Sequence, residues 1–202
     1  MDLMAMIGSG AASTPVILST FVASPNTSYE AVGVAGMLLM NQAGSLSVLS
    51  NVWPQLANEP NRVLVIPALR DEWRDTTPAG VAQLSSLVGS PAVTADLRAA
   101  AIRSLMATHT AASLPLFSQL LFGSNPTEQT EAAIAISAFV NGCNIQTPAT
   151  VASLGSLYCD NSAPYKSADT MANRIFGFGS QAEQASAIAY WQSWWTSHPG
   201  VQ

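Results

Sequence analysis

Residues 77–106 read TPAGVAQLSSLVGSPAVTADLRAAAIRSLM, and this stretch decides the fold. Thr77-Pro78 is typical of a helix N-cap followed by proline at the first helical position, where no hydrogen bond is lost. Gly89-Ser90-Pro91 breaks this first helix, and a second amphipathic stretch begins near Thr94. The stretch therefore predicts two helices whose buried residues recur at helical spacing: Val81, Leu84, Leu87 and Val88 in the first, and Leu97, Ala101, Ile102, Leu105 and Met106 in the second.

The same pattern returns about 34 residues later, in residues 114–140. This copy reads LPLFSQLLFGSNPTEQTEAAIAISAFV, with a Gly-Ser-Asn-Pro break between its two apolar parts. The offset predicts that matched positions of the two copies are buried alike: Ile102 with Ile136, Leu105 with Phe139, and Met106 with Val140.

Prolines punctuate the whole chain at similar intervals of 31 to 38 residues. A supersecondary unit that recurs at this period stacks on copies of itself. We therefore expect an all-α fold, an α-α superhelix of about five helix pairs over residues 14–177, with the second helices lining the concave side. Residues 1–13 precede the array, and residues 178–202 form a capping helix and tail. The prolines that mark the breaks within the five pairs are Pro25, Pro60, Pro91, Pro126 and Pro164.

The second pair is the least regular, because Pro54 and Pro67 fall inside its two apolar stretches. A proline in a helix removes a backbone hydrogen bond, so bends are expected there. Elsewhere, a polar residue followed three positions later by glutamate predicts a capping box at a helix start. The three expected boxes are Thr27 with Glu30, Asn125 with Glu128, and Ser180 with Glu183.

The composition excludes two classes of partner. Only 9% of the 202 residues are charged, and the formal charge is −5, so a phosphate backbone would be repelled and no nucleic acid is expected. The most apolar run, residues 31–40, is far shorter than the roughly 20 residues of a membrane helix, so no membrane insertion is expected. The charged fraction of this chain is far below the roughly 25% of typical globular proteins. Ser, Thr, Asn and Gln must therefore cover most of the surface.

The segments Leu114-Pro115-Leu116-Phe117 to Glu131-Ala132-Ala133-Ile134-Ala135 resemble a HEAT repeat, and Asp96-Leu97-Arg98-Ala99-Ala100-Ala101 is similar to the start of that family's second helix. The resemblance implies a non-enzymatic scaffold for a protein or peptide partner, with no cofactor and no metal. Only the third pair keeps the family's second-helix arginine, Arg98, so the stacked polar ladder of HEAT arrays is expected to be absent. The ending Trp191-x-x-Trp194-Trp195 resembles tails that follow HEAT-like arrays in exported bacterial proteins, which implies a periplasmic or secreted location.

Two alternatives stay open: a HEAT-like enzyme, and a small-molecule or carbohydrate-binding module with a polar concave pocket. The sequence contains no Gly-x-Ser-x-Gly, His-Glu-x-x-His, phosphate-binding Gly-rich loop or Cys-x-x-Cys motif, so no catalytic residue is assigned. A carboxylate, an arginine and a histidine converging in one concave pocket would favour the enzyme.

The candidate partner-binding patch is Arg70, Glu72, Trp73 and Arg74, in a segment where charge is concentrated around a tryptophan. Tryptophan and arginine dominate the energetics of many interfaces. The alternative is a solvated helix end with local ion pairs, each of which stabilises little.

Three further groups of residues have potential chemistry: the terminal aromatic cluster, one histidine and the two cysteines. Tyr190, Trp191, Trp194 and Trp195 could stack on a ligand, but the three tryptophans share one helical face suited to covering the end of a repeat array. His109 lacks visible catalytic partners and suits the last turn of a helix. Cys143 and Cys159 could form a disulfide, and the sequence leaves open whether they are bonded.

Overall fold

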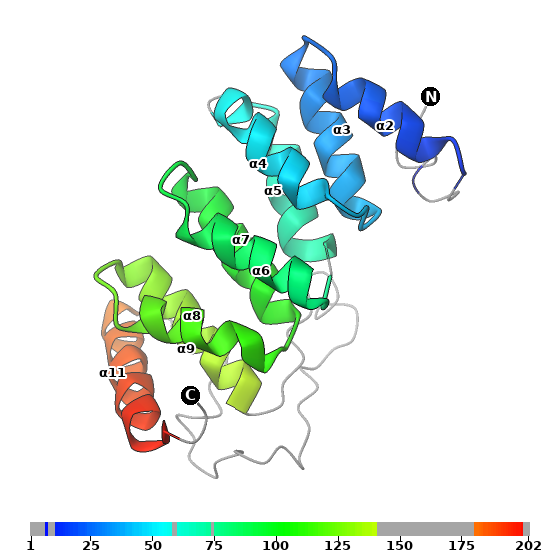
Figure 1. Cartoon of the computed structure of the whole chain (residues 1–202). Coiled ribbons are helices and arrows are strands. Elements are labelled where there is room, and N and C mark those ends of the chain that lie inside the picture. The colour runs from blue at the N-terminus through cyan, green and yellow to red at the C-terminus, as the bar shows by residue number, and fades with distance from the viewer. Residues whose placement is uncertain (1–6, 8–10, 58–59, 74, 141–179, 200–202) are drawn as a thin grey trace. The chain divides into compact units, whose positions relative to one another are not determined.

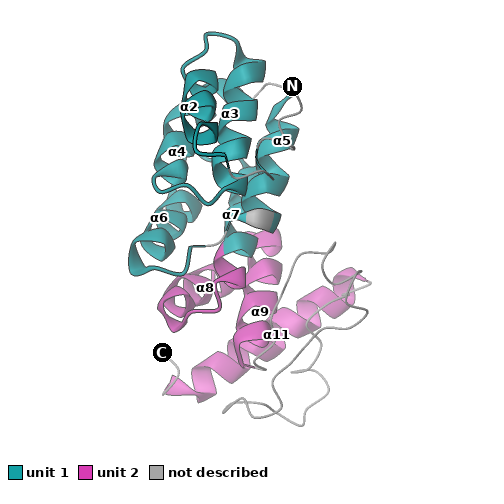
Figure 2. Ribbon diagram, turned by 90° about the vertical axis from the view of Figure 1, so that its right-hand side faces the viewer, with its two compact units in different colours: residues 1–104 teal, residues 105–202 magenta. Residues whose placement is uncertain are grey.

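The computed structural model describes residue 7 and residues 11–57, 60–73, 75–140 and 180–199. The described residues form nine α-helices, one π-helix and one 3₁₀-helix, with no β-strand among them. The prediction of an all-α fold is therefore confirmed. The chain divides into two compact units, residues 1–104 (unit 1) and residues 105–202 (unit 2), and Figure 2 shows them in different colours.

Unit 1 contains three successive helix pairs (Figure 1). The first helices of the pairs, α2, α4 and α6, form one row, and α3, α5 and α7 lie beside them (Figure 2). Contacts of α3 with α4, and of α4 with α6, join neighbouring pairs. The helices are α2 (Thr14–Val22), α3 (Thr27–Leu39), α4 (Ser45–Leu56), α5 (Arg62–Pro67) with its π-helical continuation η1 (Ala68–Glu72), α6 (Pro78–Gly89) and α7 (Ala95–Ala107), whose last turn belongs to unit 2.

Unit 2 contains one further helix pair and a final helix. After the 3₁₀ turn η2 (Ala111–Ser113), helix α8 (Leu114–Leu121) packs against α9 (Pro126–Val140). Helix α11 (Gln181–Ser197) packs against both, and its Gln192 side chain donates a 2.9 Å hydrogen bond to the Leu121 carbonyl at the end of α8.

The helix starts show which of the sequence signals are correct. The Thr77 hydroxyl accepts a hydrogen bond from the Gly80 N–H at 3.2 Å, so it caps α6 as predicted. Ser180 and Glu183 form the predicted reciprocal capping box of α11. The predicted box of Thr27 and Glu30 is wrong, because the cap of α3 is Asn26, whose side chain accepts from the Ser28 N–H.

The matched core positions of the third and fourth pairs are buried at five of the six sites predicted. Phe139 is the exception: it is half-buried, and its ring stacks on the His109 imidazole with centroids 5.4 Å apart. A surface position at the end of α9 can hold an aromatic residue because its histidine neighbour covers one face of the ring. The five buried residues are Ile102, Leu105, Met106, Ile136 and Val140.

The helix type changes after one of the two prolines of the second pair, and the bends expected at both stay a prediction. Pro54 lies inside α4, which continues to Leu56. Pro67 ends α5, and the chain then widens into the π-helix η1, in which the Trp73 N–H reaches back to the Ala68 carbonyl at 3.0 Å. The missing N–H and the ring of Pro67 affect the turn before it, whereas η1 follows it, so the proline marks where the helix type changes but does not by itself explain the π-helix.

The first pair is held together by a close helix crossing. A Cβ atom on Gly33 would lie 2.7 Å from the Val22 nitrogen and 2.9 Å from the Leu18 carbonyl oxygen. Only glycine allows the α2 backbone to come so near to α3. The apolar run of residues 31–40 is thus a buried core helix, as its length predicts.

Candidate functional site

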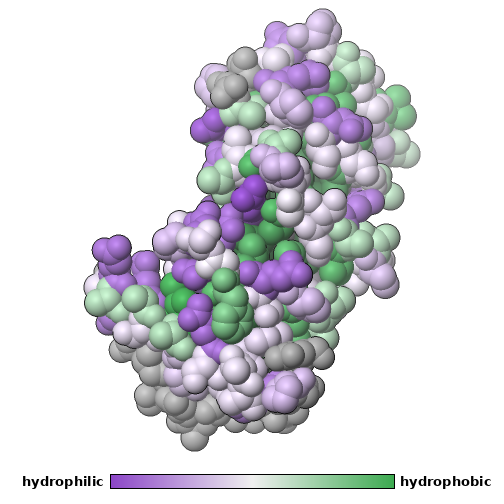
Figure 3. Space-filling view, turned by 60° about the vertical axis from the view of Figure 1, so that its left-hand side comes forward, coloured by the Kyte–Doolittle hydropathy of each residue, from purple (hydrophilic) through white to green (hydrophobic). Residues whose placement is uncertain are grey.

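Charge is distributed unequally between the first and the second helices of the pairs. The first helices α2, α4, α6 and α8 contain no Asp, Glu, Lys or Arg, and their exposed positions are mainly Ser, Thr, Asn, Gln, Ala and Pro. The charged residues of the described helices are confined to the second helices, to η1 and to α11. On the face shown in Figure 3, hydrophilic residues are interspersed with neutral and apolar ones. The charged groups that could choose a partner therefore lie on the second helices, on η1 and on α11, and not on the first helices.

Polar side chains link successive helix pairs of unit 1 at sequence separations of 33 and 34 residues. The Asn61 amide donates to the Ser28 hydroxyl at 2.6 Å, across 33 residues. The Arg62 guanidinium lies 3.4 Å from the Asp96 carboxylate, across 34 residues. These links use positions other than the family's second-helix arginine, so the expectation about the family's own polar ladder stays a prediction.

Burial and the neighbouring groups shift the pKa of Asp96 in opposite directions. Burial alone would raise the pKa of Asp96, but hydrogen bonds to its carboxylate, including one from the Leu97 N–H at 3.0 Å, and the charge of Arg62 lower it. The net result is a pKa below the ordinary range. Arg62 is also fixed by a hydrogen bond from its Nη1 to the Ala57 carbonyl.

Trp73, the centre of the predicted binding patch, is buried. Its indole N–H donates to the Ser45 hydroxyl at 3.0 Å, and its carbonyl accepts from the Ser104 hydroxyl at 3.2 Å. The indole ring thus lies in the core beside Ser45 of the second pair, which leaves little of it for the partner contact that the sequence analysis considered.

Arg70 remains at the surface beside this core residue. Its Nε and Nη2 donate to the two carboxylate oxygens of Asp71 at 2.7 and 2.6 Å, a bidentate pair. The hydrogen bond to Asp71 is the main cause of a pKa of Arg70 above the ordinary value. The Glu72 side chain and the whole of Arg74 lie outside the described residues, so their part in the predicted patch stays a prediction.

The helix just before this segment exposes a run of aliphatic residues that the sequence analysis did not single out. Val63 is 64% exposed and Leu64 is 45% exposed, and Pro67 is exposed as well. An unbroken apolar run such as Val-Leu-Val-Ile normally indicates burial, which hides the patch from pattern analysis. The sequence signal that could have revealed this exposed patch is the spacing of Arg62, Ile66 and Arg70. They follow one another four residues apart, which places two charged residues on one side of the helix.

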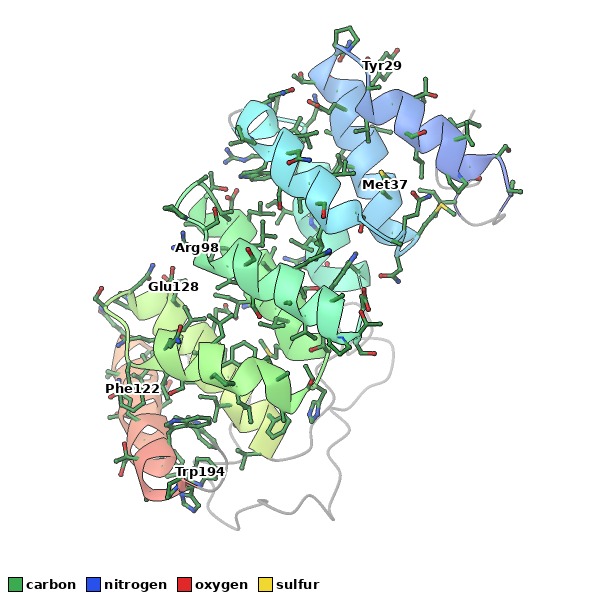
Figure 4. All side chains as sticks on the ribbon, viewed as in Figure 1. Tyr29, Met37, Arg98, Phe122, Glu128 and Trp194 are labelled. Carbon is green, nitrogen blue, oxygen red and sulfur yellow. The ribbon has the colours of Figure 1, made fainter. Side chains whose placement is uncertain are left out.

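The terminal aromatic cluster is a packing feature of unit 2. Trp191, Trp194 and Trp195 are buried, as expected of a face that covers neighbouring helices. Trp194, labelled near the end of α11 in Figure 4, stacks on His198 with ring centroids 4.1 Å apart. The His198 Nδ1 lies 2.8 Å from the Trp194 carbonyl, so this histidine satisfies the helix end.

The other residues of potential chemistry form no assembled site in the part of the chain that the structure describes. His109 has a left-handed backbone, with φ of 52°, and stacks on Phe139. Cys143 and Cys159 lie outside the described residues, as does the predicted fifth pair. Within the described ranges, no group of three or more His, Cys, Asp and Glu side chains is arranged to hold a metal ion.

Comparison with family models, with curated proteins and with solved structures returned no match. The resemblance to HEAT repeats therefore stays an interpretation of the sequence. Among the described helices, none combines the length and the apolar character that crossing a bilayer requires.

Proposed function

We propose that this chain is a HEAT-like solenoid that acts as a non-enzymatic scaffold for a protein or peptide partner. The observation that carries the proposal is the arrangement of unit 1. Three helix pairs repeat in two rows, and side chains about one repeat apart contact each other, as in Asn61 with Ser28 and Arg62 with Asp96. Repeat arrays bury each unit only against its neighbours and leave a long face for recognition.

The segregation of charge supports a binding role for the second-helix row. Uncharged first helices supply packing and a neutral surface, whereas the second helices and η1 carry arginine and carboxylate groups that can select a partner. The low charge of the remaining surface favours binding through apolar and neutral polar contacts. We propose further that the protein acts outside the cytoplasm, which rests on its charge-poor surface and on the resemblance of its tail.

The experiment that tests the scaffold is binding of a purified partner. The immobilised chain captures partners from extract and from periplasmic or culture fractions, and each captured protein is then purified and titrated by calorimetry. A saturable 1:1 complex supports the proposal. The proposal fails if no captured protein binds the chain in purified form, or if the chain turns over a substrate and loses that activity when one polar residue is replaced without loss of fold.

The solenoid itself is tested by small-angle scattering. An elongated array has a larger radius of gyration than a compact globule, which for 202 residues is about 16–17 Å. A radius clearly above this range, for a monodisperse monomer, supports the array. A radius within it contradicts the array independently of any partner.

A further inference from the structure

The exposed face of α5 combines an aliphatic patch with two flanking arginines. Val63 and Leu64 are largely exposed, Pro67 is exposed and Ile66 is half-buried, whereas Val65 packs into the core. Single exposed apolar residues are common on protein surfaces, but adjacent ones on one short helix form a contiguous patch. We name Val63, Leu64, Ile66 and Pro67 the α5 patch.

Arginines stand at both ends of the α5 patch. Arg62, Ile66 and Arg70 follow one another four residues apart, which places them along one side of the helix and its π-helical continuation. Their guanidinium-bearing side chains are 39% and 34% exposed, although each has an aspartate neighbour. Because a guanidinium has five donors, a ligand carboxylate can bind each arginine beside its aspartate.

The surrounding region is the basic part of an acidic chain. Five of the seven Lys and Arg residues lie between positions 62 and 103, against a formal charge of −5 for the whole chain. Four acidic residues occupy the same interval, so it carries a small positive excess while the remainder is negative. An acidic ligand is therefore repelled least at the second helices of the second and third pairs.

We propose that the α5 patch binds an extended segment of a partner protein in which aliphatic side chains lie between two acidic residues. Arg62 and Arg70 are eight residues apart, or about 12 Å along a helix at roughly 1.5 Å per residue. An extended peptide covers that distance in about four residues at roughly 3.3 Å each. The fitting segment thus has carboxylates about four positions apart with Val, Leu or Ile between them. This assignment rests on the proposed scaffold function.

The test uses a fluorescein-labelled probe peptide of sequence GEVLVEG and fluorescence anisotropy in 50 mM NaCl. Two matched peptides, GKVLVKG and GESSSEG, separately remove the acidic and the aliphatic features. We expect saturable binding of the first peptide, at least tenfold weaker binding of each of the others, and severalfold weakening of the first in 300 mM NaCl. Equal binding of the lysine peptide, or no binding of the first, overturns the proposal.

Variants of the chain locate the site. Val63→Ser combined with Leu64→Ser removes the aliphatic contacts, and Arg62→Gln combined with Arg70→Gln removes the charges. Val16→Ser is the matched control, because Val16 is 67% exposed on α2. Both double variants should bind the probe at least tenfold more weakly, and the control should bind within twofold of the unmodified chain. Circular dichroism verifies that each variant folds. If Val16→Ser weakens probe binding as much as the double variants do, the assignment of the site is wrong.

Two further outcomes separate this proposal from its alternatives. If sedimentation shows a dimer that the Val63→Ser, Leu64→Ser variant abolishes, the patch binds a second copy and the peptide assignment is wrong. If a purified partner binds this variant as tightly as the unmodified chain, the scaffold function stands but its site lies elsewhere.

Discussion

The indole N–H of Trp73 donates a 3.0 Å hydrogen bond to the hydroxyl of Ser45, and both residues are buried. The bond joins the residue that follows η1 to the first residue of α4, across 28 positions of the chain. The bond thereby holds the end of η1 against the start of α4 within the second pair.

Replacing either of the two residues should lower the free energy of unfolding. Ser45→Ala leaves a buried N–H without its acceptor, and we expect a loss of about 1–3 kcal/mol in the free energy of unfolding. Trp73→Phe removes the donor and some volume and should also destabilise. The double variant, measured by urea unfolding, should lose less than the sum of the two single losses because the two residues share one interaction. Strict additivity would show that the bond contributes nothing.

The crossing of α2 and α3 should reject any side chain at Gly33. In Gly33→Ala the new Cβ meets backbone atoms of Val22 and Leu18 below 3.0 Å, so the helices must move apart, at a cost of about 1–3 kcal/mol. The matched control is Gly89→Ala, at the end of α6, where nothing lies within 4 Å of the added Cβ. This control should be neutral, or stabilise by up to about 1 kcal/mol because alanine favours a helix. Equal thermal stability of the two variants would contradict the close crossing.

Helix α11 should be an integral part of unit 2. Trp194→Ala removes a buried ring that packs on Trp191 and His198, and we expect a loss of about 3–5 kcal/mol. Leu105→Ala, at a fully buried position of α7, should cost about 2–5 kcal/mol. The control Phe122→Ala removes a half-exposed ring and should cost much less. An unchanged melting temperature in Trp194→Ala would instead favour a role of the cluster in ligand binding.

Glu30 and Asp96 should shift the pH dependence of stability in opposite directions. Glu30 is buried in α3, which packs against the uncharged helices α2 and α4 and also against α5 and η1. The charged residues of these last two elements are Arg62, Arg70, Asp71 and Glu72. With its amide nitrogen oriented toward Glu30, Gln55 donates to the two carboxylate oxygens at 3.2 and 3.3 Å. Burial raises the pKa of Glu30, so folding favours the protonated form and the stability from this group falls as the pH rises through the folded-state pKa. Glu30→Gln should therefore gain stability relative to the unmodified chain on going from pH 4 to pH 7.

Asp96→Asn is the comparison of opposite sign. The pKa of Asp96 is lowered in the folded chain, so its contribution is present above the unfolded-state pKa and is lost as the pH falls through the folded-state value. Asp96→Asn should destabilise at pH 7, and this difference should shrink as the pH falls below the unfolded-state pKa of the carboxyl. Unfolding free energies across this range check both signs, and pH-independent differences would refute them.

Local signals predicted much of the fold because they act within one turn of helix. Thr77-Pro78 and Ser180 with Glu183 mark the starts of α6 and α11 as expected. The core positions of α7 and α9 follow from the 34-residue offset. The cap of α3 was misassigned because Asn26 and Thr27 are both good caps, and only the direction of the entering chain chooses between them.

The candidate site was harder to predict because its surface depends on tertiary packing. Trp73 and Val63 are both apolar, and nothing in their neighbours tells which one is buried. The π-helix after Pro67 decides it, because it turns Trp73 inward while α5 keeps Val65 as its one buried residue. Helix type at a proline is a consequence of packing, so periodicity could not supply it.

The π-helix η1 also has a consequence for how the second pair tolerates changes in length. A π-turn closes its hydrogen bonds over one more residue than an α-turn does. A π-turn can therefore accommodate the insertion of one residue, or the deletion of one, with little disturbance of the elements on either side. In this chain the additional residue lies between Ala68 and Trp73, whose N–H bonds to the Ala68 carbonyl five residues back. Removing one residue from η1 would let that N–H close an α-type bond to the same carbonyl and keep the indole near Ser45, so this irregular segment tolerates a change of length that the regular helices around it would not.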